Sequence, residues 1–310
     1  MKLRNFFFAL IAIASFSLVT SCTDEEPVTP VKTNNIVDVV VNTPDFSLLK
    51  TAVVRAGLSD ALKGANLTVF APTNQAFINA GFKTEADINA ADVTVLANIL
   101  KYHVLASKVA AADIKTADNQ ELTMLSGAKA YLTKDANGVS INAAKVTKAD
   151  VAADNGVIHI IDAVIIAPTK TIVDLVVGNP DLKLLKEAVL RASTGKTPVA
   201  TILSGAGPFT VFAPTNTAFE NAGFNSAKIA SSDPDFLATV LTYHAVAARV
   251  FSTNLKSGNV KTVEGREVTI NAANATVQGG LNSTASKITA VNILATNGVV
   301  HVIDAILLPK

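Results

Sequence analysis

The chain contains one ten-residue stretch twice: Thr-Val-Phe-Ala-Pro-Thr-Asn-Gln-Ala-Phe at 68–77 and Thr-Val-Phe-Ala-Pro-Thr-Asn-Thr-Ala-Phe at 210–219. Its first half is β-branched and aromatic, which predicts a short strand that ends at the proline. Thr73 or Asn74 is a suitable N-cap for a helix that carries Phe77. The stretch therefore predicts a strand followed directly by a helix, at two places in the chain.

Three other segments recur in the same order, and together they define a long internal repeat. The paired segments are 35–40 with 171–176, Tyr102-His103 with Tyr243-His244, and 155–163 with 297–305. They are separated by 136 residues in the first case and by 141 or 142 in the others, so one six-residue insertion lies within 193–207. A period this long indicates two tandem domains, because solenoid repeats are much shorter. We place the domains at 35–168 and 169–310.

Within each copy the pattern changes from helical to strand-like. Leu96, Leu100 and His103 lie on one helical stripe together with Ile99, and the same spacing recurs before His244. Beyond this stripe, turn signals separate predicted strands at 130–132, 139–142, 146 and 157–166. The last segment is apolar on both faces, which is typical of a strand between two layers. The sequence thus predicts an α+β fold.

The N-terminus has the features of an export signal. Lys2 and Arg4 precede a mostly apolar run at 6–19, which is shorter than the roughly 20 residues that span a bilayer. The segment Val-Thr-Ser-Cys at 19–22 resembles a bacterial lipobox, in which the cysteine is lipidated and becomes the new N-terminus. We therefore expect a signal peptide at 1–21 and a lipidated Cys22 that begins a flexible tether at 22–34. The acids at 24–26 resemble a surface-export signal of Bacteroidetes-type lipoproteins, and they are equally typical of a polar linker.

Composition excludes several classes of protein. Hydrophobic residues make up 49% of the chain and charged residues 16%, so most of it can form packed cores. Without residues 1–21 the chain has 24 basic and 25 acidic side chains, and this balance argues against nucleic-acid binding. A single cysteine excludes an intrachain disulfide framework and a thiolate metal cluster.

All four histidines, His103, His159, His244 and His301, lie in the repeated segments, so any catalytic or metal site would have to use them. No His-x-x-x-His spacing accompanies them, and we expect no metal, no cofactor and no catalytic residue. Instead we expect buried structural histidines, because an imidazole without hydrogen bonds would be costly inside a core. Backbone groups, Tyr102, Asn74 and Asp162 are the expected partners.

The three motifs together resemble the fasciclin domain family, twice. They are the 68–77 stretch, the Tyr-His pair, and Asn-Gly-Val-(Ile/Val)-His-(Ile/Val)-Ile-Asp at 155–162 and 297–304. The resemblance implies two tandem domains, each a wedge-like β-sandwich with a helical layer. Fasciclin domains occur in secreted or membrane-anchored proteins that mediate cell adhesion, and no enzymatic activity is general to them. The resemblance implies the same for this chain. Some members have been assigned partner binding at stretches around the Tyr-His and last motifs, so the resemblance implies either a structural or a partner-binding role for the motif residues. These are Tyr102, His103, His159, Asp162, Tyr243, His244, His301 and Asp304.

These observations predict a non-enzymatic adhesion or binding module, anchored by lipid to the bacterial envelope as a surface-exposed outer-membrane lipoprotein. Its ligand would be a protein or glycan at the cell surface or matrix, and the membrane would be contacted through the lipid alone. The alternative is an accessory glycan- or small-molecule-binding lipoprotein of a nutrient-uptake system. Binding is expected at exposed loops and at segments that differ between the copies, such as 115–127 and 254–266.

Overall fold

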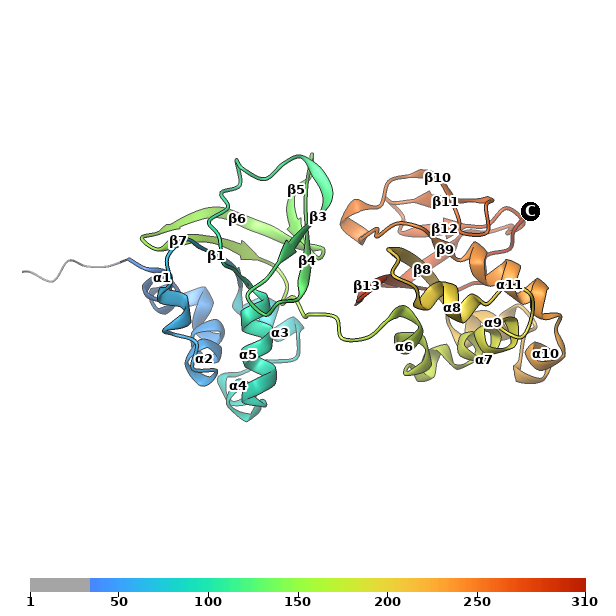
Figure 1. Cartoon of the computed structure of the whole chain (residues 1–310), viewed down its shortest axis with the longest axis horizontal. Coiled ribbons are helices and arrows are strands. Elements are labelled where there is room, and N and C mark those ends of the chain that lie inside the picture. Colours follow the sequence, from blue (N-terminus) through green and yellow to red (C-terminus); the bar gives the residue numbers. More distant parts are fainter. Residues whose placement is uncertain (1–33) are drawn as a thin grey trace, which may run out of the picture. The chain divides into compact units, whose positions relative to one another are not determined.

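The computed structural model describes residues 34–310, in which both repeats belong to one compact unit. The predicted signal peptide at 1–21 and Cys22 lie outside the described residues, and so does the predicted tether except for Asn34. In each repeat the helices gather on one side of a sheet (Figure 1).

Four of the five α-helices of the first repeat begin at a side-chain cap, and the helix that begins at Ser47 does not. Asn35 and Asp38 form a capping box at the start of the first helix, and Thr84 and Asp87 form another. Thr73, one of the two expected caps, accepts a hydrogen bond from the Ala76 amide, so the predicted strand-to-helix transition is confirmed. The helices are α1 (Ile36–Asn42), α2 (Ser47–Arg55), α3 (Asn74–Asn79), α4 (Glu85–Ala90) and α5 (Val93–Tyr102), with short 3-10 turns at Pro44–Phe46 and Ala61–Lys63.

Seven strands form the sheet of the first repeat, in the order β2-β1-β7-β6-β5-β4-β3. The pair β1 and β7, second and third from one edge, is parallel, and every other neighbouring pair is antiparallel. A parallel pair needs a long crossover, which here contains the helices α3 to α5 and the remaining strands. The strands are β1 (Leu67–Pro72), β2 (Val104–Leu105), β3 (Ala117–Thr123), β4 (Lys129–Asp135), β5 (Gly138–Ile141), β6 (Ala144–Ala153) and β7 (Gly156–Ile161).

The second repeat has the same sheet order. Read from the edge that corresponds to β3 of the first repeat, it is β10-β11-β12-β13-β14-β8-β9. Its six-residue insertion adds the helix α8 where the first repeat has a 3-10 turn. The helices are α6 (Ile172–Val177), α7 (Lys183–Ala192), α8 (Val199–Ser204), α9 (Asn216–Asn221), α10 (Ser226–Ser231) and α11 (Pro234–Tyr243), with 3-10 turns at Pro180–Leu182 and Ser252–Asn254. The strands are β8 (Phe209–Pro214), β9 (Ala245–Val246), β10 (Gly258–Lys261), β11 (Glu267–Asn271), β12 (Thr276–Gln278), β13 (Ser286–Ala295) and β14 (Gly298–Ile303).

Two hydrophobic cores lie on opposite faces of β1. Val69 and Ala71 belong to the core that contains α1, α2 and α5, whereas Phe70 belongs to the core built from β4, β5 and the loop after β7. Successive side chains of a strand point to opposite faces, so a strand between two cores must be apolar throughout. The expectation of an α+β fold is thus confirmed. The part of the expected sandwiched segment 157–166 that forms β7 also lies between the two cores, because Ile158 belongs to the first and Ile161 to the second.

One predicted strand is too long. The segment 157–166 was expected to be a single strand, but β7 ends at Ile161 and residues 162–166 form no strand. Ile165 nevertheless stays buried, because its side chain packs in the second core and its amide donates to a histidine ring. The apolar run is explained by burial of a loop rather than by strand pairing.

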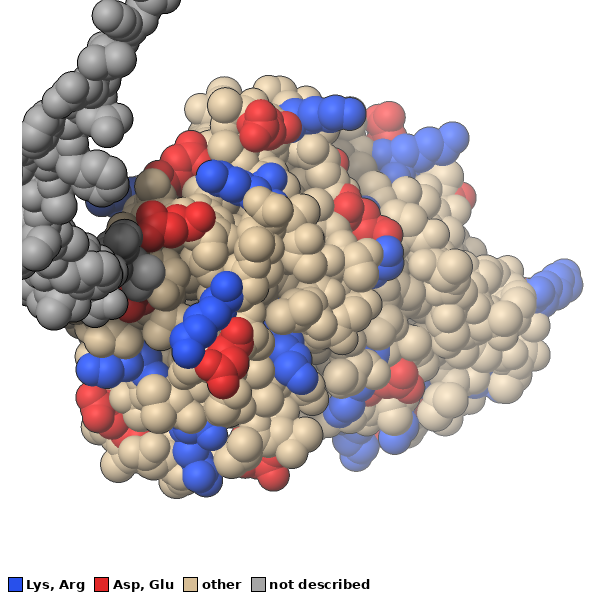
Figure 2. Space-filling model, turned by 60° about the vertical axis from the view of Figure 1, so that its left-hand side comes forward, with Lys and Arg blue, Asp and Glu red and all other residues tan. Residues whose placement is uncertain are grey.

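The surface is consistent with the near-neutral composition. On the face shown in Figure 2, basic and acidic side chains alternate and neither kind gathers into a patch. Across residues 34–310, no helix combines the length and the apolar character that crossing a membrane requires.

Candidate functional site

His103 follows α5 directly and is buried between the helices and the sheet. Its Nδ1 lies 2.8 Å from the Ile99 carbonyl oxygen, and its Nε2 accepts a hydrogen bond of 3.0 Å from the Ile165 amide. Nδ1 therefore carries the proton and Nε2 does not. Burial lowers the pKa of His103 to about 4, partly offset by the hydrogen bond to Ile99. The ring joins the end of α5 to the loop after β7.

His159 lies in β7 and holds a different pair of backbone groups. The Asp150 amide donates to its Nδ1 over 3.3 Å, and its Nε2 donates to the Val109 carbonyl over 2.9 Å. Asp150 has a φ of +55°, in the left-handed region, at an irregularity in the pairing of β6 with β7. The ring thus fixes a bulge in β6 and the loop after β2 against β7.

The second repeat reproduces both arrangements. His244 Nδ1 lies 2.7 Å from the Val240 carbonyl, and Nε2 accepts from the Leu307 amide at 2.9 Å. His301 accepts from the Asn292 amide at 3.3 Å and donates to the Val250 carbonyl at 2.9 Å. Burial lowers the pKa of His244 to about 4 and also lowers the pKa of His301.

The tyrosines of the Tyr-His pairs also bind backbone. Tyr102 is fully buried, donates to the Lys129 carbonyl at 2.7 Å and accepts from the Asn142 amide group at 2.8 Å. Burial raises the pKa of Tyr102 to about 12. Tyr243 makes the corresponding bond to the Glu267 carbonyl and accepts from the Gly280 amide. Each tyrosine connects the end of a helix to the strand-rich half of its repeat.

The aspartates of the last motif are exposed at the end of the sheet. Asp162 Oδ1 accepts from the Lys145 amide at 2.7 Å, and Asp304 Oδ1 accepts from the Lys287 amide at the same distance. Neither aspartate contacts a histidine through the hydrogen bonds of the described residues. Each holds the first residues of β6 or β13 beside the end of the following strand.

The expected partners of the histidines were therefore correct for the backbone and wrong for the three side chains. Asn74 instead accepts from the Leu48 amide at 3.0 Å and donates to the Pro44 carbonyl, so it connects α3 with α2. Tyr102 and Asp162 bind the backbone groups described above. Tertiary folding supplies loop amides and carbonyls that are distant in sequence, and a single sequence does not show which of them will face the ring.

The motifs form no single catalytic cluster. Both ring nitrogens of all four histidines are occupied by backbone groups, so neither nitrogen is free for a substrate or a metal ion. Among residues 34–310, no group of three or more His, Cys, Asp or Glu side chains is placed to hold a metal ion. In this arrangement the four imidazoles connect segments of the fold.

Two pairs of structural residues were missed from the sequence. Thr68 Oγ1 donates to the Ser107 carbonyl and accepts from the Val109 amide, and Thr210 makes the same contacts in the second repeat. Asn155 accepts from the Ile36 amide and donates to the carbonyls of residues 62 and 64, and Asn297 is its counterpart. Their recurrence inside the motifs was the available signal.

The segments expected to bind partners partly contact each other. Asp118, within 115–127, lies 3.3 Å from Lys256 Nζ, within 254–266. Asn254 Nδ2 also donates to Asp118 Oδ1 over 3.0 Å. These two segments therefore do not present wholly free loops.

Comparison with known proteins finds the same family at both repeats. The family model "Fasciclin domain" matches residues 44–167 and 187–309. The chain is 31% identical over 251 residues to the transforming growth factor-beta-induced protein ig-h3 of Sus scrofa, which covers 79% of this chain and 35% of that protein. It is 42% identical over 137 residues to protein sll1483 of Synechocystis sp., which covers 43% of this chain and 73% of that protein. The chain thus spans about a third of the length of the first relative.

A solved structure, a FAS1 domain pair from the insect cell adhesion molecule fasciclin I, is 19% identical to the chain. The match covers 84% of this chain and 95% of that one, with a TM-score of 0.40.

Proposed function

Because the chain belongs to the fasciclin domain family, we propose that it is a non-enzymatic binding protein of the cell surface, anchored by lipid on Cys22 and bound to a protein partner through its helical face. The absence of a free imidazole in the motifs supports binding rather than catalysis. The observation that carries the proposal is an apolar crevice found at equivalent places in both repeats.

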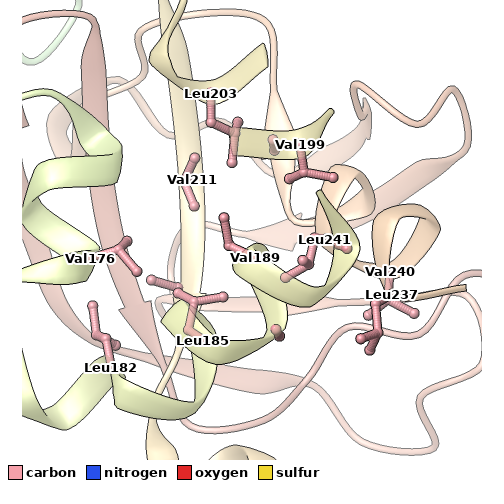
Figure 3. Close-up of a cluster of buried hydrophobic side chains, with 14 of the residues drawn as sticks. Val176, Leu182, Leu185, Val189, Val199, Leu203, Val211, Leu237, Val240 and Leu241 are labelled. Carbon is pink, nitrogen blue, oxygen red and sulfur yellow. The ribbon is translucent and has the colours of Figure 1, made fainter. Parts of the chain in front are cut away.

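The crevices are small and lined almost entirely by apolar side chains. In the first repeat the crevice offers about 20 Å³ and is bounded by α1, α2, α5 and β1. In the second it offers about 50 Å³ and is bounded by α6, α7, α8, β8 and α11. Figure 3 shows Val189, Leu203 and Val211 converging there from α7, α8 and β8. The histidine and lysine in each lining are His103 with Lys101 and His244 with Lys186.

Exposed apolar residues lie on the same helices in both copies. Val41 and Val54 are 44% and 65% exposed, and their counterparts Val177 and Leu190 are 47% and 55% exposed. Val177 and Leu190 themselves line the second crevice. Exposed positions are free to become polar as two copies diverge, as the pair Ile78 and Glu220 illustrates. The pairs Val41 with Val177 and Val54 with Leu190 have instead kept exposed apolar side chains, which indicates a binding face.

The chemistry of this face favours a protein partner. Pockets for small molecules usually have several polar groups that orient the ligand, and sugar sites usually have flat aromatic rings. The only polar side chains that line these crevices are the histidine, whose nitrogens are occupied, and one lysine. The aromatic rings of Phe70 and Phe212 in the linings are buried, so they offer no exposed flat surface to a sugar. Only the tip of a partner's apolar side chain, such as a methyl group, fits crevices of this size, and the exposed apolar residues beside them would contact the rest of that side chain.

A charge placed on this face is expected to abolish attachment. The double variant Val54→Asp with Leu190→Asp should reduce attachment of protein-coated beads to intact partner cells or matrix by about tenfold or more, because burying an unpaired charge against a partner is costly. Both side chains are already exposed, so circular dichroism should show an unchanged fold. Attachment is measured by counting retained beads under constant flow.

Ile78→Glu is the matched control, because the second repeat already has Glu220 at that place. It should attach as the wild type does. Failure of the wild-type protein to attach, or equal attachment of the double aspartate variant, would contradict the proposed face.

The lipid anchor has a separate test. Cys22→Ser should move the protein from the membrane fraction to the soluble fraction, because its thiol is the proposed site of diacylation and two acyl chains give durable attachment. The measurement is an immunoblot of both fractions, with protease treatment of intact cells to show surface exposure. Asn221→Asp, an exposed change in the second repeat, should leave the distribution unchanged. Membrane retention of the serine variant would refute lipidation at Cys22.

A further inference from the structure

Arg249 has an unusual environment for an arginine of a loop. It is only 7% exposed, and its Nη1 donates to the Gly298 carbonyl at 2.8 Å and to the Ala295 carbonyl at 3.3 Å. Its guanidinium carbon lies 4.0 Å from the centre of the Tyr131 ring, which belongs to the first repeat. The flat cation is therefore held by carbonyls of its own repeat and covered by an aromatic ring of the other.

Hydrogen bonds surround this stacked pair. Asn254 is buried, and its Nδ2 donates to both Asp118 Oδ1 and Thr133 Oγ1 over 3.0 Å. Asn119 donates from its side chain to the Arg249 carbonyl. Phe251 lies beside Tyr131, with ring centres 6.4 Å apart. Most of the polar groups that would be costly to bury alone thus find partners across the two repeats, and Asn119 Oδ1 is the exception among the described residues.

We infer that the two repeats are joined as one rigid body by an interface between the β3–β4 region of the first repeat and residues 249–256 of the second. This interface is defined by Asp118, Asn119, Tyr131, Thr133, Arg249, Phe251, Asn254 and Lys256. Tandem domains on a linker move relative to each other by default, unless a specific interface prevents it. Here a desolvated arginine and a buried amide provide that specificity.

The interface explains why these segments differ between the copies. The counterpart of Arg249 in the first repeat is Lys108, which is exposed. The counterpart of Tyr131 in the second repeat is Thr269, which is exposed too. A contact between unlike surfaces needs different residues on its two sides, whereas a symmetric contact would keep them alike. The segments 115–127 and 254–266 therefore differ between the copies partly because one copy docks on the other. The docking residues in these segments are Asp118, Asn119, Asn254 and Lys256.

Docking also changes how the pair would bind. When two modules are joined by a flexible linker, binding of one raises the effective concentration of the other near many arrangements of partner sites. When two modules form one rigid body, both can bind at once only if the partner's sites have the same spacing. The inference concerns the architecture of the pair and does not depend on the proposed binding face.

An added negative charge at the interface tests the inference without removing Arg249. Asn254→Asp replaces a donor by a carboxylate that faces Asp118, so the two acids repel each other and the repeats should separate. Adding Asp118→Asn to the same chain lets the amide of residue 118 donate to the carboxylate of residue 254, which is the reverse of the wild-type hydrogen bond. This second change should restore docking. Asn221→Asp adds the same charge at an exposed position away from these contacts and is the matched control.

The measurement is the distance between spin labels on the full chain by electron–electron double resonance. Labels are attached at Lys83→Cys and Lys228→Cys, which are both exposed, in a Cys22→Ser background. The wild-type interface should give one narrow distance distribution, and Asn254→Asp should broaden it about twofold or more, as expected for domains on a free linker. The double exchange with Asp118→Asn should narrow it again, and Asn221→Asp should leave it unchanged.

Two results would overturn the inference. A broad distribution in the wild-type interface would show that the repeats are not docked. A narrow distribution that persists in Asn254→Asp would show that these residues do not hold them. Circular dichroism of each variant distinguishes loss of docking from loss of folding.

Discussion

Gly156→Ala is expected to destabilise the first repeat by about 3 kcal/mol, near the upper end of what overpacking of a core usually costs. Gly156 begins β7 and pairs with Leu67 of the parallel strand β1. A Cβ atom at this position would lie 2.1 Å from the Leu67 carbonyl oxygen and 3.0 Å from Ile36 Cδ1. The carbonyl is backbone, so the parallel pair β1 and β7 itself would have to separate.

The measurement is urea unfolding followed by far-ultraviolet circular dichroism, because the chain has no tryptophan. Gly298→Ala should act alike in the second repeat, where the Cβ would lie 2.1 Å from the Phe209 carbonyl oxygen. Gly64→Ala is the matched control, since its Cβ would approach other atoms no closer than 3.4 Å. An unfolding midpoint of Gly156→Ala equal to that of Gly64→Ala would disprove the close approach of β1 and β7.

Acid is expected to remove about 3 kcal/mol of stability from each repeat between pH 6.5 and pH 4, because each has a histidine that is buried in the neutral form. The pKa of His103 and of His244 is about 4 in the folded chain, against an ordinary value of 6.5. In this window the unfolded chain binds a proton at each histidine and the folded chain does not. Stability therefore falls as the pH falls through 6.5, and the loss levels off near pH 4.

Carboxylates act at lower pH and can be distinguished from the histidines. The pKa values of Asp87 and Asp174 are lowered by hydrogen bonds from Thr84 and Thr171, so their contribution is lost below the ordinary value of 3.8. A loss of stability between pH 6.5 and pH 4.5 therefore belongs mainly to buried imidazoles, to which His301 also adds because its pKa is lowered.

His103→Gln tests the assignment to a single residue. A glutamine amide can donate toward Ile99 and accept from Ile165 but does not titrate. The variant should lose stability at pH 7.5. Its unfolding free energy should change less with pH, because unfolding of the first repeat would take up about one proton fewer than in the wild type. Urea unfolding at intervals between pH 4.5 and pH 7.5 measures the slope. If the slope of the variant matched that of the wild type, His103 would not be the titrating group.

The sequence predicted much of the fold because its signals are local. The stretch at 68–77 specifies a strand, a stop and a cap within ten residues, and the structure shows β1, Pro72 and the Thr73 cap in that order. The repeat made the second domain predictable from the first. The error at 162–166 arose because an apolar run indicates burial, and burial does not distinguish a strand from a loop held inside a core.

The roles of the motif residues depended on contacts that are distant in sequence. His103 was expected to be a buried structural residue, and the structure places its ring between Ile99 and Ile165, which are separated by 66 positions. No periodicity predicts that the Ile165 amide is the group that needs an acceptor. The same reason hid Thr68 and Asn155, whose polar atoms satisfy backbone groups of loops elsewhere in the chain.

Arg249 shows most clearly what local signals cannot supply. In the sequence it is one basic residue in a segment without a motif, aligned with an exposed lysine of the other copy. Its burial results from the meeting of two surfaces, each of which is polar on its own. By itself the sequence determined that one α+β domain occurs twice, since periodicity, capping and turn chemistry act over a few residues. The tertiary structure alone decided which backbone groups the histidines satisfy and how the copies contact each other, because these depend on groups that only folding brings within hydrogen-bond distance.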